Sequence, residues 1–570
     1  MNRNDTLAAL RERPDIAVLV IGGGINGISV FRELALQGVD VVLADKGDYC
    51  SGASAALSRM VHGGLRYLEN GEFKLVRESL AERDRLLKNA PHCVAPLPTT
   101  VPIFDIFSGI ANGAVRFLGL SRRPSRRGAL VIKAGLIMYD LFTAARRLMP
   151  THRFRGRRKT LEAWPAINPT IRSSATYYDA WVSQPERLGL EMLFDAMNAS
   201  ASAQALNYVS VGSTEAGLVL TDTMTGEALP LRPQLIINAT GGWIDLTNKA
   251  IGAAVPRMMG GTKGSHLIVD NPELHAALGG HMVYYENEDG RICILFPYLG
   301  KVLIGSTDIR VDDPDQVRCE DDERNYILQS LAFVFPSITI APSEIVFRFS
   351  GVRPLPASSD SFTGRIPRDH FCEFVEPTGH LPATLCMIGG KWTTFRSFGA
   401  MAADMVLQRL GLTRKTGTED LAIGGGRDFP ADPDTWCASL AAKHGLSTER
   451  ARVLFERYGT SAEDRAAHIA AAEMLPRSDY SAGELRFMIE HEHVERLADL
   501  FLRRTTIAIT GGLNLALIDT VLAMLVSHRG WDVAQTAAER SAFLALLEHQ
   551  HSVGFSDTSQ TNDRRSAQCA

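Results

Sequence analysis

The chain has 570 residues, which is too long for a single hydrophobic core and suggests two to four domains. Its composition is that of a soluble globular protein, and a net charge of −4 gives no reason to expect nucleic acid as a partner. Eight scattered cysteines without a C-x-x-C pair argue against a zinc site or a disulfide framework and fit a reducing compartment. Without a signal peptide or about 18 uninterrupted apolar residues, the chain is expected to be cytoplasmic.

The first predicted elements are a strand, a glycine turn, a helix and a second strand. The six apolar residues 16–21 are typical of a strand buried on both faces. Three glycines follow with the spacing G-x-G-x-x-G: Gly22, Gly24 and Gly27. A helix then extends to Gln37, and the strand 39–44 ends at Asp45, whose carboxylate can bind a ribose hydroxyl. Because a helix N-terminus attracts phosphates, this order predicts a dinucleotide-binding fold.

A glycine pair, Gly63 and Gly64, lies among side chains that suit a binding site. His62 precedes the pair, and Arg66 and Tyr67 follow it. His62 alone is typical of a hydrogen-bonded core histidine, but the cluster around a flexible turn favours a site.

The next region combines apolar and basic residues. A charged amphipathic helix is expected over 72–90, followed by an apolar segment over 103–120. Residues 116–159 contain thirteen Lys and Arg and a single acid, Asp140. This combination suits docking on an anionic bilayer surface, and it equally suits a solvated basic face beside a core helix.

The middle of the chain is expected to be rich in strands. A hairpin is predicted over 206–221, a sheet over 266–310 and a further strand over 344–349. Lys263 and His266 are expected to place a cation and an imidazole close together.

Two further strands end in glycines. One ends in Ala-Thr before Gly241, and the strand over 386–388 ends before Gly389 and Gly390, where a helix over 395–410 begins. Open α/β sheets bind ligands at such strand ends. Because the glycine-rich segments are far apart in sequence, we expect a discontinuous nucleotide domain and a long, buried cofactor such as a flavin dinucleotide.

The C-terminal part is expected to be a separate helical domain over about 430–550, joined through a linker at 424–426. One helix is predicted over 484–504. Its Glu-His-Glu-His run, 490–493, is expected to form a solvated charged face, because alternate helical positions point about 200° apart. A disordered tail follows from about residue 553.

Several motifs together resemble the FAD-dependent glycerol-3-phosphate dehydrogenases. They lie at 22–27, 62–69, 238–241, 263–266, 305–308, 350–354, 389–394, 491–496 and 503–505. The resemblance covers roughly residues 16–530 in family order. It implies an α/β fold: an FAD-binding, doubly wound, glutathione-reductase-like nucleotide domain with an inserted mixed-sheet substrate domain, plus an all-α C-terminal domain.

The expected boundaries follow from these segments. The FAD-dependent oxidoreductase region takes 16–424, the helical domain 425–550 and the disordered tail 551–570. Within the first region, the nucleotide domain takes about 16–75, 185–245 and 350–410, and the substrate domain takes about 76–184 and 246–349.

The resemblance implies oxidation of sn-glycerol 3-phosphate to dihydroxyacetone phosphate, with hydride passing to FAD and electrons to quinone. It also implies peripheral binding to the inner face of the cytoplasmic membrane, and it leaves a homodimer open. Some positions depart from the family pattern, among them Asp45, where many members have glutamate, and the long basic segment. A dehydrogenase of another polyol phosphate, such as erythritol 4-phosphate, would keep the same motifs. A flavin amine or amino-acid oxidase and a flavoprotein without turnover are further alternatives.

The candidate residues follow from this chemistry. Three arginines suit the substrate phosphate: Arg66, Arg353 and Arg368. Tyr67 is expected to orient the substrate, and Arg353 also to stabilise a developing alkoxide. His266 is the first candidate for the base and His62 the second. Lys391 is expected near the flavin.

The residues expected to bind FAD are Gly22, Gly24, Asn26, Gly27, Asp45, Ser54, Ser58, Gly63, Gly64, Gly241, Gly389, Gly390, Lys391 and Thr393. No metal is expected.

Overall fold

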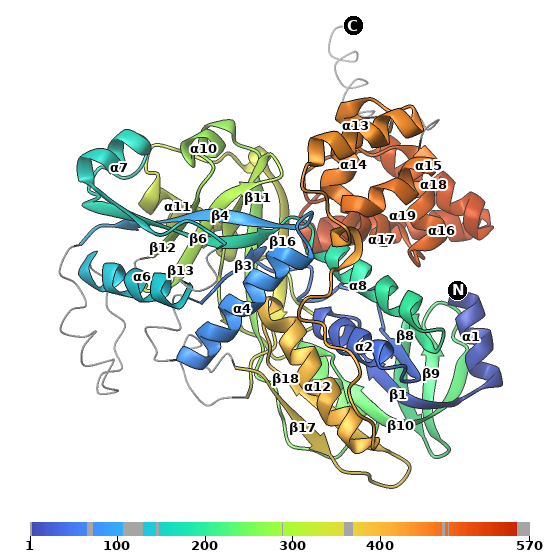
Figure 1. The fold of residues 1–570 in the computed structure, drawn as a ribbon. Helices are drawn as coiled ribbons and strands as arrows, with labels where there is room; N and C mark the ends of the chain where they lie inside the picture. Colours follow the sequence, from blue (N-terminus) through green and yellow to red (C-terminus); the bar gives the residue numbers. More distant parts are fainter. Residues whose placement is uncertain are drawn as a thin grey trace, which may run out of the picture.

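In a computed structural model of the protein, the structure describes residues 3–64, 72–105, 129–143, 148–287, 289–357, 369–469, 474–476 and 478–555. These residues form two β-sheets with helices on their faces and a helical C-terminal region beside both sheets (Figure 1).

The first sheet has the order β17-β18-β10-β1-β2-β7, and the hairpin β8–β9 extends from β10. Its strands are β1 (Asp15–Ile21), β2 (Val41–Ala44), β7 (Ala203–Leu206), β8 (Val209–Thr214), β9 (Gly217–Asp222), β10 (Ala228–Asn238), β17 (Phe371–Val375) and β18 (Ala383–Ile388). The strands from β18 to β7 run parallel, so their carboxyl ends meet at one edge. The predicted strand, turn, helix and strand are confirmed as β1, α2 (Ile25–Leu36) and β2.

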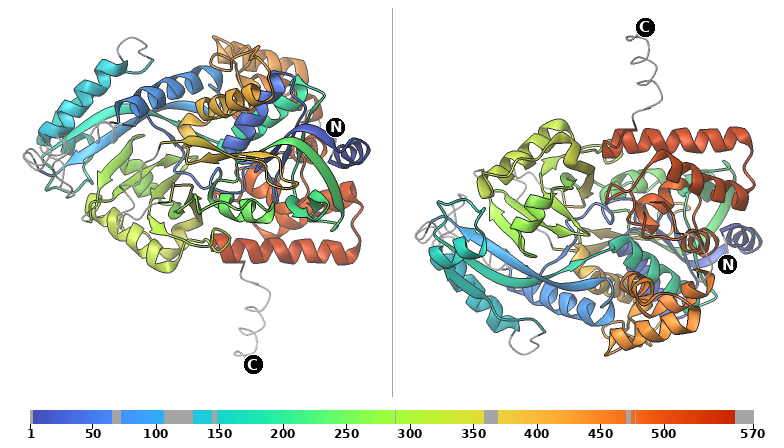
Figure 2. Two further views of the ribbon diagram at one scale, coloured as in Figure 1. Left: turned by 90° about the horizontal axis from the view of Figure 1, so that it is seen from below. Right: turned by 90° about the horizontal axis from the view of Figure 1, so that it is seen from above.

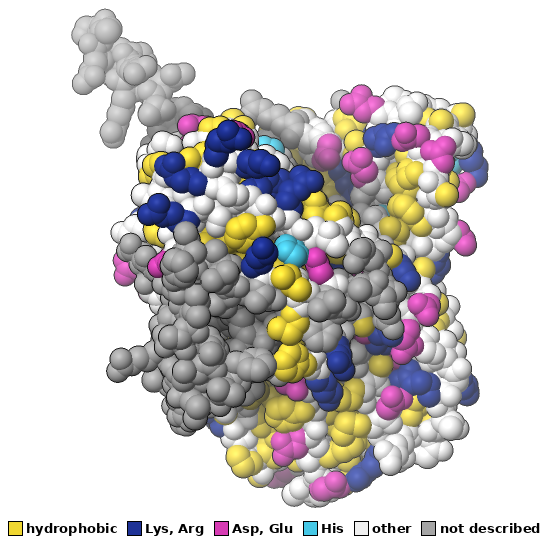
Figure 3. Space-filling model, turned by 60° about the vertical axis from the view of Figure 1, so that its left-hand side comes forward, with side chains coloured by type: hydrophobic (Ala, Val, Ile, Leu, Met, Phe, Trp, Pro, Cys, Tyr) yellow, Lys and Arg dark blue, Asp and Glu magenta, His cyan; other side chains and the backbone are white. Residues whose placement is uncertain are grey.

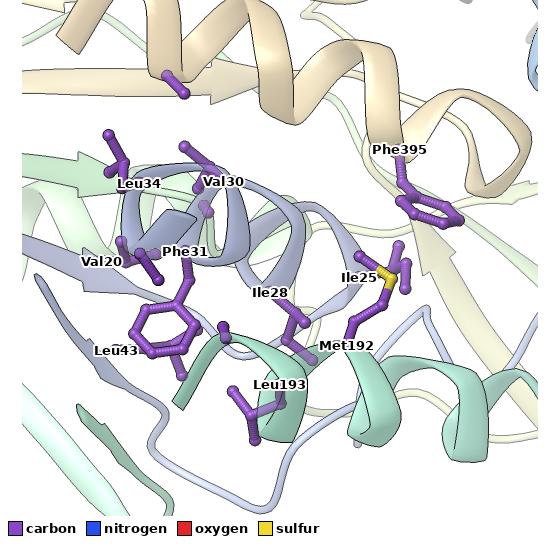
Figure 4. Close-up of a cluster of buried hydrophobic side chains, with 14 of the residues drawn as sticks. Val20, Ile25, Ile28, Val30, Phe31, Leu34, Leu43, Met192, Leu193 and Phe395 are labelled. Atoms are coloured by element: carbon purple, nitrogen blue, oxygen red, sulfur yellow. The ribbon is translucent and has the colours of Figure 1, made fainter. Parts of the chain in front are cut away.

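Three helices cover one face of this sheet: α2, α8 (Pro185–Ala199) and α12 (Phe395–Arg409). Figure 4 shows how α2 lies between the other two, with Phe31 and Ile28 turned towards Leu193 and Met192 of α8, and Phe395 of α12 beyond them. Burial of such large side chains fixes α2, and with it the glycine turn that precedes it.

The opposite face is covered by the β8–β9 hairpin and by α1 (Arg3–Glu12). The hairpin is confirmed at its predicted place. Helix α1 was not predicted, because residues 3–12 are mostly polar. Its Leu7 and Leu10 are buried against the sheet, and tertiary packing rather than a strong apolar periodicity stabilises it.

The second sheet has the order β15-β11-β14-β13-β12-β4-β6-β3, with β16 paired to β11 and β5 to β6. Its strands are β3 (Met60–Val61), β4 (Val94–Ile103), β5 (Arg153–Gly156), β6 (Ser173–Val182), β11 (Thr262–Val269), β12 (Met282–Glu286), β13 (Ile292–Tyr298), β14 (Lys301–Gly305), β15 (Ile309–Arg310) and β16 (Ile345–Arg353). The pairs are antiparallel except β4 with β12, so the sheet is mixed. The predicted strand-rich region over 266–310 is confirmed.

Helices cover this sheet as well. The helices α10 (Pro272–Ala277) and α11 (Asp321–Val334) pack on one face, and the C-terminal helices pack on the other. A smaller core joins β4 and β6 to α4 (Phe73–Asn89) and α6 (Ala129–Thr143). Helix α4 confirms the amphipathic helix predicted over 72–90. The apolar segment predicted over 103–120 lies outside the described residues from position 106 onward, as do positions 116–128 and 144–147 of the basic segment.

The C-terminal region is helical, as predicted. It consists of α13 (Pro433–His444), α14 (Thr448–Tyr458), α15 (Ala462–Ile469), α16 (Ala482–His491), α17 (Leu497–Asp499), a π-turn (Leu500–Arg504), α18 (Leu515–Arg529) and α19 (Val533–His551). Figure 2 shows α19 running along one side of the molecule, with the yellow-green α11 beyond one of its ends. The end of α19 contacts β16 of the second sheet.

Two predictions about this region are wrong. The helix expected over 484–504 breaks after His491, because Glu492 and His493 turn inward and are buried, and His493 has a φ of 49°. The prediction of a solvated charged face is therefore correct only for Glu490 and His491, which are exposed. Residues 424–426, expected to be a linker, form a buried turn in which a Cβ on Gly425 would lie 1.8 Å from the carbonyl oxygen of Tyr458.

Candidate active site

The glycine turn after β1 is closely packed on all sides. Gly22 has a φ of +107°, and a Cβ there would lie 2.8 Å from the carbonyl oxygen of Ala239 at the end of β10. A Cβ on Gly27 would lie 1.9 Å from the carbonyl oxygen of Gly22. Gly24 is the N-cap of α2 and offers no side-chain cap, while the Ser54 hydroxyl accepts a hydrogen bond from the amide of Ile25 at 2.9 Å. The turn therefore presents backbone amides where a pyrophosphate can approach.

Asp45 directly follows β2, as predicted, and its carboxylate faces the glycine turn. It accepts hydrogen bonds from the amides of Gly23 at 2.5 Å and Gly47 at 2.8 Å. Burial raises the pKa of Asp45, and these two amides partly offset the shift. Its predicted role as the ribose acceptor requires the same oxygen atoms, so a bound ribose would share or replace these contacts.

A cavity of about 150 Å³ lies where strand ends of the two sheets meet. The described residues that line it are His62, Arg353, Pro354, Leu355, Pro356, Asp369, Gly389, Gly390 and Lys391. His62 follows β3, Arg353 ends β16, and the glycine pair follows β18. Four separate segments thus line one cavity. The sequence analysis named site residues in three of them, at 62, 353–356 and 389–391.

The glycine pair at this cavity adopts a conformation that favours glycine. Gly389 and Gly390 have φ values of +78° and +97°, and a Cβ on Gly390 would lie 2.8 Å from Nδ2 of Asn26. Asn26 lies in the first turn of α2, and its buried Oδ1 has no hydrogen-bond partner among the described residues. An unpaired buried oxygen beside glycine backbone fits a polar group of a bound cofactor.

Arg353 is fixed in place by several acceptors. Its guanidinium donates to Oδ1 of Asp308 at 2.9 Å, to Oγ of Ser306 at 3.1 Å and to the carbonyl oxygen of Thr307 at 3.0 Å. It lies over Gly264, where a Cβ would be only 2.1 Å from Nη2. A rigid, half-buried guanidinium at the cavity wall suits an anionic group.

His266 lies deeper than the cavity wall. Its ring is buried and stacks on Phe349, with the two ring centroids 5.0 Å apart. Within the part of the chain that the structure describes, neither ring nitrogen has a hydrogen-bond partner. Burial, together with the charges of Arg353 and Arg59, lowers the pKa of His266 to about 3. The imidazole is therefore neutral near pH 7 and has free lone-pair capacity.

The two candidate bases thus occupy different places. His62, the second choice, lines the cavity, whereas His266, the first choice, lies beside Arg353 without lining it. The predicted closeness of Lys263 and His266 is wrong. Their side chains point to opposite faces of β11, and Lys263 forms a buried ion pair with Glu323 at 2.7 Å.

The other predicted residues are spread around these walls. The Gly63 amide donates to the carboxylate of Asp179, Gly241 has a φ of +59° just after β10, Ser58 is half-buried and Thr393 is buried. Arg66, Tyr67 and Arg368 lie outside the described residues.

Sequence reasoning assigned no role to three carboxylates at or behind the cavity, although Asp308 belongs to one of the motifs: Asp179, Asp308 and Asp369. An acid in the middle of an apolar strand could have indicated Asp179, because buried carboxylates need partners.

The motifs near residues 491–505 do not line the cavity but hold the segment under the glycine turn. The buried carboxylate of Asp48 pairs with Arg503 and Arg504, and the Tyr49 hydroxyl is 3.1 Å from Nδ1 of His493. Burial alone would raise the pKa of Asp48, but Arg504 and Arg503 outweigh it and lower that pKa to about 2. The C-terminal region therefore anchors the loop that follows Asp45.

Comparison with known proteins assigns the chain. A family model described as FAD dependent oxidoreductase matches residues 17–396, and one described as the C-terminal domain of alpha-glycerophosphate oxidase matches residues 416–536. A glycerol-3-phosphate dehydrogenase of Synechocystis sp. is 33% identical over 560 residues, which cover 93% of this chain and 96% of the relative. The chain belongs to the FAD-dependent glycerol-3-phosphate dehydrogenase family.

Two further comparisons describe this membership. A D-erythritol 1-phosphate dehydrogenase of Brucella abortus is 29% identical over 497 residues, covering 86% of this chain and 93% of the relative. The crystal structure of the glycerol-3-phosphate dehydrogenase from Bacillus halodurans in complex with FAD has the same fold, with a TM-score of 0.73, 22% identity and coverage of 96% and 97% of the two chains. The expected fold class and FAD as the cofactor are confirmed. The glycine turn, the N-terminus of α2 and Asn26 fit that cofactor.

Proposed function

We propose that the protein oxidises sn-glycerol 3-phosphate to dihydroxyacetone phosphate. The observation that carries this proposal is the cavity in which Arg353, Lys391 and His62 meet the glycine pair at the end of β18. Two cations and an imidazole suit a substrate that carries a phosphate dianion and an alcohol to be deprotonated. FAD, when bound, accepts the hydride from the alcohol carbon.

The residues divide this work according to their positions. Arg353 binds the anionic end of the substrate or stabilises the oxygen on which negative charge develops, because its other contacts already fix its plane. Lys391 lies beside the glycine pair, where a cation favours negative charge on a reduced ring. A neutral histidine accepts the alcohol proton, and the bound phosphate dianion would raise the pKa of that histidine towards neutrality.

One comparison favours a second candidate substrate, an erythritol phosphate. The relative from Brucella abortus, named for D-erythritol 1-phosphate, matches 86% of this chain. A longer polyol phosphate would place the same phosphate and the same reacting alcohol in a cavity with the same cations. The two substrates differ in the chain between these groups, so the described walls support both.

The experiment is anaerobic bleaching of the flavin absorbance of the purified holoprotein. Rapid bleaching by sn-glycerol 3-phosphate, slow bleaching by erythritol phosphates and none by a neutral amino acid would support the proposal. If only an erythritol phosphate bleaches the flavin fast, the substrate is that longer polyol phosphate. If only the amino acid bleaches it, the protein is an amino-acid oxidase rather than a polyol-phosphate dehydrogenase. A bound flavin that none of the three reduces would contradict the proposal.

Two histidine variants decide which ring acts as the base. His266→Ala and His62→Ala are each expected to keep FAD bound, and loss of the base is expected to slow flavin reduction about 100-fold or more. Arg353→Lys keeps the charge but not the planar fork, so it should raise the KM for the phosphate. Arg348→Lys on the same strand, where Arg348 pairs with Asp321, is the matched control.

We further propose that electrons pass to a membrane quinone and that the basic surface around α7 (Arg157–Ala163) docks on anionic lipid. This surface carries Arg153, Arg155, Arg157, Arg158 and Lys159. Figure 3 shows Lys and Arg side chains gathered at the upper end of this face. Among the described residues, no helix is both long and apolar enough to cross a membrane.

Vesicle binding tests the lipid surface. A charge-reversed variant at Arg157, Arg158 and Lys159 should lose sedimentation with anionic vesicles, whereas three reversals at exposed Lys249, Lys415 and Arg486 should not. Equal binding by both variants would contradict the docking surface. Faster reoxidation of the reduced flavin by a soluble quinone than by oxygen would support the acceptor, and the reverse order would oppose it.

A further inference from the structure

One carboxylate oxygen behind the cavity receives three donors from three different elements. Oδ1 of Asp179 on β6 accepts from the Gly63 amide at 2.7 Å, from the Tyr139 hydroxyl at 2.7 Å and from Nη1 of Arg83 at 3.3 Å. Asp179 is only 1% exposed, so these contacts are the ones it has in place of water. The site described above makes no direct use of this residue.

The hydrogen bond from the Gly63 amide to Asp179 extends the pairing of β3 with β6, whose backbone ladder ends just before the cavity. Strand β3 pairs with β6 at Met60 with Trp181 and at Val61 with Ala180. The next residue, His62, lines the cavity, and the residue after it gives its amide to Asp179. His62 is therefore held on one side by a backbone ladder and on the other by a charge-assisted hydrogen bond, which is the stronger kind.

The identity of Gly63 is explained by the same contact. A Cβ on Gly63 would lie 2.2 Å from the hydroxyl oxygen of Tyr139 and 2.4 Å from Cδ2 of Leu80. The phenol thus lies directly against the backbone that follows His62. Arg83 also donates to the Tyr139 hydroxyl at 2.7 Å, so the ring is held from two sides.

Tyr139 extends this contact to a helix that reaches the protein surface. It is buried on α6, while Ile137, two residues earlier, is 47% exposed. The same helix therefore contacts solvent with one side and the loop of His62 with the other. A displacement of α6 would act on Asp179 and Gly63 before it acted on the cofactor turn, which lies on the other sheet.

We propose that Asp179 is a positioning residue that holds His62 against the substrate cavity, and that Tyr139 joins this position to α6. This inference rests on the proposed function for the role of His62 in the reaction. The geometry itself, a carboxylate fixing the amide next to His62, does not depend on the substrate.

A double-mutant cycle tests the first half. His62→Ala and Asp179→Asn should each slow flavin reduction by the polyol phosphate, the latter about 10-fold, whereas Asp179→Asn in the His62→Ala background should slow it no further. Asp222→Asn is the matched control. Asp222, on β9 and far from the cavity, is also a buried carboxylate paired with an arginine, Arg3 of α1. It should leave the reduction rate unchanged. Full additivity of the two site variants would overturn the positioning role.

Hydrogen exchange tests the geometry without any substrate. In Asp179→Ala the Gly63 amide should exchange at least 10-fold faster than in the native protein, and Tyr139→Phe should give a smaller increase in the same peptide. The control Asp222→Asn should leave that peptide unchanged. Unchanged exchange at Gly63 in Asp179→Ala would overturn the proposal even if the enzyme is active. A failure of polyol phosphates to reduce the flavin would instead contradict the proposed function and leave this exchange result standing.

Discussion

A methyl group added at Gly305 is expected to displace His266 without removing it. Gly305 pairs with His266 across β14 and β11, and a Cβ there would lie 2.2 Å from Cδ2 of the imidazole. Carbon atoms in contact are about 3.5 Å apart, so the ring must move by about 1.3 Å. Phe349 stacks on the ring and restricts its path. Because a misplacement of about 1 Å can cost about 100-fold in rate, Gly305→Ala should slow flavin reduction by about that factor with FAD still bound.

The assay is anaerobic stopped-flow bleaching by sn-glycerol 3-phosphate, with a crystal structure of the variant to locate the ring. Gly212→Ala on β8 is the matched control, because its Cβ would meet only the carbonyl oxygen of Ala250 at an ordinary 3.8 Å. Overpacking at Gly305 should also lower the stability by about 1–3 kcal/mol. The reasoning fails if the ring has moved and the reduction rate is nevertheless that of the native protein.

Three further outcomes follow from buried groups. The pKa of His266 is about 3 in the folded protein and about 6.5 in the unfolded chain, so its contribution to stability is full above about pH 6.5 and is lost as the pH falls. The free energy of unfolding should be lower by about 2 kcal/mol at pH 5. Urea midpoints at pH 7 and pH 5 check this, and the drop between them should be smaller for His266→Gln. Buried arginines lower the pKa of Glu492 to about 2 despite its burial, so Glu492→Gln leaves them uncompensated and should cost about 3–5 kcal/mol in the same titration at pH 7; a loss under 1 kcal/mol would contradict this. Gly27→Ala places a Cβ 1.9 Å from the Gly22 carbonyl oxygen and should abolish FAD retention on gel filtration, and a full flavin complement would contradict the packing described.

The fold could be predicted best where the determining contacts are close in sequence. The unit from β1 to β2 was found because apolar runs, a glycine turn and a helix succeed one another within about thirty residues. The break after His491 could not be found in this way. Glu492 turns inward to meet Arg187, which is 305 residues away in the chain, so helical periodicity alone continued the element too far.

The site was predictable in its composition more than in its arrangement. Glycine pairs indicated His62 and Lys391, and the chemistry of a phosphate substrate indicated Arg353. These three residues do meet at one cavity. Lys263 was misplaced, because a spacing of three along a strand sends side chains to opposite faces. Asp179 escaped notice since its importance depends on a neighbouring strand, β3, only two residues long.

The ion pair between Asp48 and Arg504 joins residues 456 positions apart, and this separation sets an order for biosynthesis. A ribosome releases the segment that carries Asp48 early. Arg503 and Arg504, which neutralise its carboxylate, follow 455 and 456 positions later. Until then a segment destined for the interior carries an uncompensated charge and favours water over burial. We therefore expect the nascent chain to capture FAD late, and chains that stall before residue 503 to reach the cell's quality-control proteases without a cofactor.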